Sequence, residues 1–164
     1  MKHKREEGAA LAEVLVVVAI LALLAGTAVP LAVRIYNYGA VRYEAEHLLS
    51  ELRYEQTLAR TAVSELDEDG SVIRSGTRPW LVFFLGGYEI RRQNEVVKRH
   101  YCLPNVSIQF RETQDEREKI LYFGPNGNVF PSLTIKVLVP GKAGASCKLV
   151  VDNAGRIRLE RSSS

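Results

Sequence analysis

The sequence has 164 residues, a formal net charge of +3 and two cysteines. The part that follows an apolar stretch near the start has about 130 residues, which is enough for one compact domain and too few for two. Charge is unevenly distributed, because residues 34–78 include six basic and eight acidic residues, whereas residues 121–164 include six basic and two acidic residues. The basic excess is therefore a property of the C-terminal part of the chain.

The first predicted element is a helix long enough to cross a membrane. Residues 14–33 form a run of twenty without a charged side chain, rich in Val, Leu, Ala and Ile. At a rise of about 1.5 Å per residue, such a run matches the roughly 30 Å hydrocarbon core of a bilayer. Because Lys2, Lys4 and Arg5 precede the span, the positive-inside rule keeps the N-terminus in the cytoplasm and places everything after about Arg34 outside it.

Glu13 lies at the start of this apolar run, five residues after Gly8. An acidic side chain inside a membrane span costs about 2.5–3.5 kcal/mol at the bilayer centre, so we interpret Glu13 as a functional group with a partner. One alternative is a signal anchor in which Glu13 reaches the lipid headgroups. Another is a secretory signal peptide cleaved near the small residues Gly26, Thr27 and Ala28, which fits poorly because its apolar region is usually about 7–15 residues long.

The helical pattern resumes beyond Pro30, which is expected to kink or loosen the helix. Residues 34–63 are predicted to form an amphipathic helix, with most of its charged residues away from the apolar stripe. Residues 65–76 are rich in Asp, Glu, Gly and Ser and are predicted to form a polar loop. The apolar stripe consists of Val41, Ala45, Leu48, Leu52 and Ala59.

From residue 79 onward the pattern is that of β-strands with short connections, which predicts an antiparallel sheet. Gly86-Gly87 predicts a two-residue hairpin that uses positive φ angles. A long helix followed by a run of strands is an α+β pattern, in which the helix stripe packs on one sheet face. The predicted strands are residues 80–85, 88–92, 96–102, 106–110, 120–123, 133–139, 147–151 and 156–159.

Cys102 and Cys147 both fall in the part predicted to be exported, where a disulfide between them is possible and two buried thiols are the alternative. The three histidines, His3, His47 and His100, are scattered along the sequence, so we predict no metal site. Neither a catalytic motif nor a glycine-rich loop opening a helix is present in the sequence, which predicts a protein that is not an enzyme and has no cofactor.

Gly8-Ala9, together with Glu13 and Pro30, resembles the class III signal of type IV prepilins and pseudopilins. In that family a basic leader ends in Gly, prepilin peptidase cuts after it, the new first residue is N-methylated, the fifth mature residue is Glu and the twenty-second is Pro. The resemblance implies cleavage between Gly8 and Ala9, methylation of Ala9, and a role in filament assembly for Glu13 and Pro30. Ala9-Ala10 stands where the family usually has Phe-Thr.

The same resemblance implies a division of the chain and a fold. Residues 1–8 would be the prepilin leader, 9–33 the transmembrane and filament-assembly half of the helix, and 34–164 an extracytoplasmic domain. Within that domain, the helix of residues 34–63 would pack on the antiparallel sheet of residues 79–164, as in the type IV pilin fold. In a filament, Glu13 could pair with the N-terminal amine of Ala9 in a neighbouring subunit, because each charge offsets the desolvation of the other.

The C-terminal Gly155-Arg156-Ile157-Arg158, together with residues 121–127 and 134–137, resembles minor pilins of the GspH/FimT class, with a layout like that of the competence pilin ComGD. In the FimT branch a terminal Gly-Arg-x-Arg motif contributes to DNA binding. If Ile157 and Leu159 face the core, Arg156 and Arg158 share the other strand face about 6.5–7 Å apart, and Lys148 and Arg161 could extend the stripe. The alternative is two arginines on a solvated face.

These resemblances imply a minor pilin that primes or caps a type IV filament and helps to bind double-stranded DNA for uptake. It would be a single-pass precursor in the bacterial inner membrane, with the N-terminus inside, and later part of an extracytoplasmic filament. Its implied partners are other major and minor pilins, prepilin peptidase and the inner-membrane assembly platform. The alternatives are a minor pseudopilin of a type II secretion system and a membrane-anchored binding module without a filament.

Overall fold

The computed structural model describes residues 3–61, 65–66, 72–73, 79–84, 86–92, 95–110, 119–141 and 145–161. Side chains are described from residue 12 onward, except at 65–66, 72–73 and 161. The chain divides into two compact units, Met1–Tyr36 and Asn37–Ser164. Each unit is considered by itself below.

Helix α1 runs from His3 to Thr61 and includes Pro30. The helix is therefore continuous at the proline, and the predicted kink there stays a prediction. In the first unit every side chain described, from residue 12 to residue 36, is exposed. By length and composition α1 could cross a membrane, because its most apolar window has a mean hydropathy of 2.7 and none of that window is buried within the chain.

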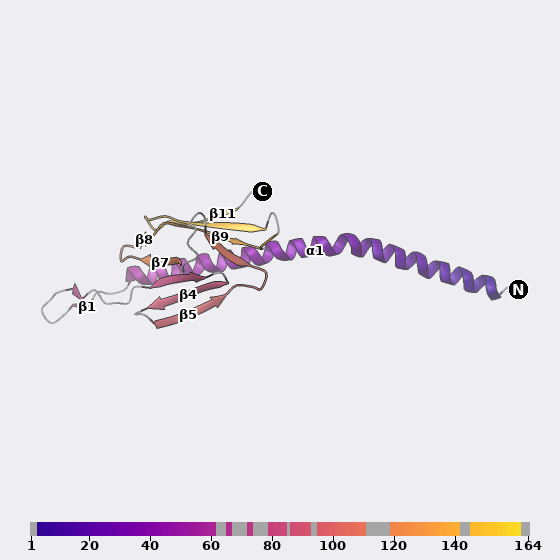
Figure 1. Ribbon diagram of the computed structural model, residues 1–164, viewed down its shortest axis with the longest axis horizontal. Helices are drawn as coiled ribbons and strands as arrows, with labels where there is room; N and C mark the ends of the chain where they lie inside the picture. Colours follow the sequence, from indigo (N-terminus) through magenta and orange to yellow (C-terminus); the bar gives the residue numbers. More distant parts are fainter. Residues whose placement is uncertain are drawn as a thin grey trace. The chain divides into compact units, whose positions relative to one another are not determined.

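Among the described residues, the second unit contains two large antiparallel sheets (Figure 1) and one two-stranded ribbon, rather than the single sheet predicted. Strands of the first sheet lie in the order β5-β4-β3-β7-β8, and those of the second in the order β11-β10-β9-β6. The first comprises β3 (Trp80–Phe84), β4 (Gly87–Arg92), β5 (Glu95–Tyr101), β7 (Lys119–Phe123) and β8 (Val129–Phe130). The second comprises β6 (Ser107–Phe110), β9 (Leu133–Leu138), β10 (Ser146–Val151) and β11 (Ile157–Arg161).

All eight predicted strands are present within one or two residues of their expected bounds, and every described pairing is antiparallel. The predicted polar loop of residues 65–76 is wrong in part, because β1 (Glu65–Leu66) and β2 (Val72–Ile73) pair as a short antiparallel ribbon. The predicted α+β class, a long helix with antiparallel strands, is confirmed.

The glycine signal at residues 86–87 marks a hairpin, but for a reason that differs from the prediction. Phe84 pairs with Gly87, so the connection is residues 85–86, and neither glycine has a positive φ. Gly87 lies inside β4, where a Cβ would come within 2.0 Å of the His100 carbonyl oxygen in β5. The residue must therefore be glycine because a neighbouring strand passes close to its backbone.

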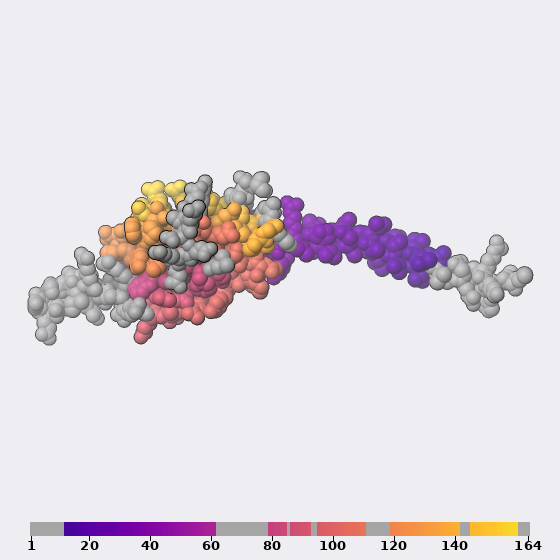
Figure 2. Space-filling view, in the orientation of Figure 1, coloured from indigo at the N-terminus to yellow at the C-terminus, as the bar shows by residue number. Residues whose placement is uncertain are grey.

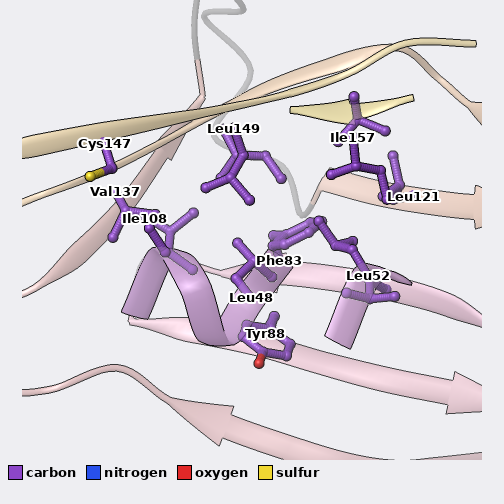
Figure 3. Packing of buried hydrophobic residues seen from close by; sticks show 14 of the residues in the cluster. Leu48, Leu52, Phe83, Tyr88, Ile108, Leu121, Val137, Cys147, Leu149 and Ile157 are labelled. Atoms are coloured by element: carbon purple, nitrogen blue, oxygen red, sulfur yellow. The ribbon is translucent and has the colours of Figure 1, made fainter. Parts of the chain in front are cut away.

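The core lies where α1 meets both sheets. Leu48 and Leu52 of α1 are buried in one cluster with Phe83 of the five-stranded sheet and Leu149 of the four-stranded sheet, as Figure 3 shows. The five residues of the predicted stripe are all buried. The stripe lies in one cluster with residues of both sheets, so a single face of the helix packs against the two sheets.

Candidate functional surfaces

The first surface is the apolar part of α1. Glu13 is exposed there, and so are the apolar side chains that follow it through Ile35. Figure 2 shows the described part of this apolar segment in indigo and violet. Gly8 and Ala9 fall within α1, with side chains outside the described set. An uncovered apolar surface of this size is typical of a site that contacts a membrane or another protein.

The second surface is the outer face of the four-stranded sheet near its C-terminal edge strand. Arg156 and Arg158 are exposed, whereas Ile157 between them is buried. This is the alternation expected of a strand with one face on the core. Arg158 lies opposite Val150 of β10. Both arginines are therefore presented to solvent, as the sequence predicted, while DNA binding by them stays a prediction.

The other two residues of the predicted basic stripe, Lys148 and Arg161, are not placed as Arg156 and Arg158 are. Lys148 faces Lys136 on one side and Glu160 on the other, and its Nζ lies 2.9 Å from Glu160 Oε2, so part of its charge is neutralised. Arg161 is opposite Cys147, and its odd spacing from Arg158 places the two positions on opposite strand faces. Sequence reasoning missed Lys136, which is exposed and which only the strand register brings next to Lys148.

The glycine of the Gly-Arg-x-Arg sequence has a structural role. Gly155 adopts φ 79° and its N–H donates to the Asp152 carbonyl, while the Arg156 N–H donates to Asp152 Oδ1 over 2.9 Å. A Cβ at Gly155 would come within 2.0 Å of the Gly127 carbonyl oxygen. Gln56 of α1 donates from Nε2 to both glycine carbonyls, 2.6 Å to Gly127 and 2.7 Å to Gly155. The turn that presents Arg156 is thus fixed to the helix.

A third feature is a row of polar side chains between α1 and strands β4 and β5, which we call the polar seam. The acidic residues of this row lie outside the apolar stripe of α1, yet two of them, Glu44 and Glu55, are buried. The partners of these acidic residues are basic residues of β4 and β5. The pairs are Glu44 with His100, Glu51 with Lys98, and Glu55 with Arg92. The sequence did contain a signal for the polar seam. Acidic residues recur at helical spacing in α1, and a strand rich in basic residues follows later in the chain.

His47 and His100, which the sequence presents as scattered, come together in this seam. Their rings stack with centroids 4.4 Å apart, and Tyr88 Oη lies 2.9 Å from His47 Nδ1. Burial and the neighbouring His100 lower the pKa of His47, and burial strongly raises the pKa of the Tyr88 phenol. One donor atom each of Glu44, His47 and His100 lies within 4.8 Å of the other two. Two histidines that are far apart in the sequence are therefore neighbours in the fold, while the absence of a metal site stays a prediction.

The two cysteines lie beside different sheets. Cys102 follows β5 and donates its backbone N–H to the Gly86 carbonyl, whereas Cys147 is buried in β10. Cys102 is a free thiol in this structure, and burial raises its pKa to about 12. The Cys102–Cys147 disulfide is therefore not formed here, and it stays a prediction for the oxidised protein.

Comparisons with known proteins give a fold. No protein-family model matches the sequence, and no curated protein matches it. Two crystal structures of the type IV minor pilin FimU from Pseudomonas aeruginosa are similar in structure. The first, in space group P21, is 20% identical with a TM-score of 0.53 and covers 77% of this chain and 92% of that one. The second, in space group P65, is 21% identical with a TM-score of 0.51, covering 75% and 94%.

The fold of this chain is therefore the type IV pilin fold, a long N-terminal helix packed on antiparallel strands. This confirms the fold that the N-terminal sequence implied. Both structural neighbours are described as type IV minor pilins.

Proposed function

We propose that this protein is a minor subunit of a type IV filament, of the GspH/FimT class. The observation that carries the proposal is the combination of a pilin fold with a membrane-length apolar helix that the rest of the chain leaves uncovered. An exposed apolar helix serves two purposes in such a subunit. It anchors the precursor in the membrane before assembly, and it packs against the helices of other subunits in the filament.

Within this proposal, Gly8 and Glu13 mark the two steps between precursor and filament. Prepilin peptidase cuts after Gly8, so that the mature chain begins at Ala9 with a new amine. The Glu13 carboxylate of one subunit pairs with that amine of its neighbour, because two opposite charges removed from water together offset part of each other's desolvation. The assembly platform and the other pilins supply the partners.

The second part of the proposal is that Arg156 and Arg158 contact DNA. Two exposed guanidinium groups on one strand face lie at a spacing comparable with that of successive phosphates. Lys136 and Lys148 lie on the same outer face, although Glu160 neutralises part of the charge of Lys148. Such a surface recognises the phosphate backbone and carries no sequence information. In the cell, the protein would capture duplex DNA at the filament for uptake.

DNA binding is tested with the full-length chain in detergent and a fluorescent duplex. We expect a Kd of about 10⁻⁴–10⁻⁶ M, weakening steeply as salt rises because counterions are released from the DNA. The double variant Arg156→Gln/Arg158→Gln should lose most of this binding and reduce the salt slope by roughly one unit per lost phosphate contact. Fluorescence anisotropy over a salt series measures both quantities.

The matched control is Arg42→Gln/Arg53→Gln, which removes two exposed arginines from α1 and should leave DNA binding unchanged. Thermal unfolding should be the same for both variants, because exposed charges contribute little to stability. If the Arg156/Arg158 variant binds as well as the parent, these arginines are not the site. If the parent does not bind at low salt, DNA uptake is the wrong function and a type II secretion pseudopilin becomes the better proposal.

A further inference from the structure

Three metal-ligand side chains meet inside the polar seam. Glu44 and His47 are three residues apart and therefore neighbours on one face of α1, and His100 comes from β5. One donor atom of each lies within 4.8 Å of the other two. The Glu44 side chain is only 3% exposed and that of His100 19%. The His47 side chain is 26% exposed. The three groups therefore form a compact set at the helix–sheet junction, with the carboxylate buried and the two rings in partial contact with water.

We propose that Glu44, His47 and His100 bind one divalent transition-metal ion, and that Zn²⁺ is the ion the site suits. Two imidazoles and one carboxylate are a donor set that binds Zn²⁺ in proteins, whereas Ca²⁺ and Mg²⁺ require oxygen donors. This site is independent of filament assembly and of DNA binding, because it uses none of the residues assigned to them.

The spacing of the donor atoms fits a metal between them. His100 Nε2 and Glu44 Oε2 are 2.8 Å apart. Because zinc–ligand bonds are about 2.0–2.1 Å long, two donors at this separation subtend an angle of roughly 85–90° at a shared ion. That angle matches neighbouring ligands in five- or six-coordinate geometry, and the ion would take the place of the hydrogen bond between the two side chains.

Hydrogen bonds outside the donor set hold two of the ligands. The Leu103 backbone N–H donates to Glu44 Oε1 over 2.9 Å, which leaves Oε2 directed at His100. Tyr88 Oη contacts His47 Nδ1, which leaves Nε2 of the same ring for an ion. Metal-ligating histidines in proteins usually have the second ring nitrogen bound in this way. Tyr88 is therefore a positioning residue for the site.

The surrounding charges favour a cation. Glu51 Oε1 lies 3.8 Å from His47 Nε2 and contacts Lys98 Nζ. The two carboxylates Glu44 and Glu51 exceed the single ammonium of Lys98, so the cluster carries a net negative charge when both rings are neutral. A bound ion would join α1 to β5, the edge strand of the five-stranded sheet, and stabilise the folded chain in proportion to its occupancy.

The test uses untagged full-length protein in detergent, with Zn²⁺ titrated in a calorimeter and Co²⁺ followed by visible absorption. We expect one Zn²⁺ per chain, and His47→Gln and His100→Gln should each weaken binding at least about tenfold. Tyr88→Phe, which removes one hydroxyl, should weaken it by about 10–100-fold without removing a ligand. His3→Gln and Glu46→Gln are the matched controls, since neither residue belongs to the cluster, and both should bind as the parent does.

Absence of stoichiometric Zn²⁺ binding by the parent would overturn the proposal, and so would parent-like binding by both His47→Gln and His100→Gln. Trp80 fluorescence reports whether each variant is folded. If the histidine variants do not fold, the Co²⁺ spectrum of the parent and the Zn²⁺ affinity of Tyr88→Phe test the proposal instead. A Co²⁺ spectrum identical to that of the free ion, or unchanged affinity in Tyr88→Phe, would then contradict the site.

Discussion

Glu13→Ala is expected to insert into the membrane as well as the parent or better, and to be absent from filaments. Insertion should not suffer, because the substitution removes a charge that costs up to about 2.5–3.5 kcal/mol within a bilayer. Assembly should fail, because the N-terminal amine of the adjacent subunit is left buried without its partner. Breaking a buried ion pair in this way costs about 3–5 kcal/mol, enough to exclude the subunit from a filament. Co-purification with other pilins, compared between membrane and sheared-filament fractions, measures the effect.

The matched control for this substitution is Leu15→Ala, two residues further along the same exposed apolar stretch of α1. It shortens one side chain and leaves the charge in place, so the protein should still enter filaments. If Glu13→Ala were recovered in the filament fraction at the level of the parent, pairing between Glu13 and the Ala9 amine would not be what admits the subunit.

Arg92→Ala is expected to lower the free energy of unfolding by about 3–5 kcal/mol, because it leaves a buried carboxylate without its partner. Arg92 Nη2 lies 2.7 Å from Glu55 Oε1, and the Glu55 side chain is 2% exposed. Among the described residues, Glu55 Oε2 has no hydrogen-bond partner at all. The carboxylate therefore depends on this one guanidinium. Urea unfolding of the full-length chain in detergent, followed by Trp80 fluorescence, gives the value.

Arg91→Ala is the control in the adjacent position of β4. Arg91 pairs with Glu89 at 2.8 Å, and Arg99 of β5 contacts the same carboxylate. Because Glu89 keeps a second partner, the loss of stability should be clearly smaller than for Arg92→Ala. If the two substitutions lower the free energy of unfolding equally, the stability of the chain does not depend on Glu55 having Arg92 as its one partner.

The fold was predictable from the sequence to the extent that local patterns determine it. The apolar stripe of α1 is buried as predicted because a helix that packs on other elements must bury one face. The alternation of Arg156, Ile157 and Arg158 follows from the period of two in a strand. These features require only neighbours along the chain.

What the sequence did not predict depends on contacts between distant residues. Glu44 and Glu55 look like solvated helix residues until β4 and β5 bring His100 and Arg92 next to them. The division into two sheets and the pairing of Lys148 with Glu160 follow from strand order and register, which no local pattern specifies. The stacking of His47 on His100 has the same origin, because the two residues are 53 positions apart in the sequence.

Processing by prepilin peptidase is the most direct test of the proposed pilin role. Intact-mass and N-terminal analysis of protein produced with the peptidase should show a chain that begins at Ala9, and Gly8→Val should keep the leader of residues 1–8. A mature N-terminus at Val29, as a secretory signal peptide would give, or an unprocessed parent chain in the presence of active peptidase, would contradict the account.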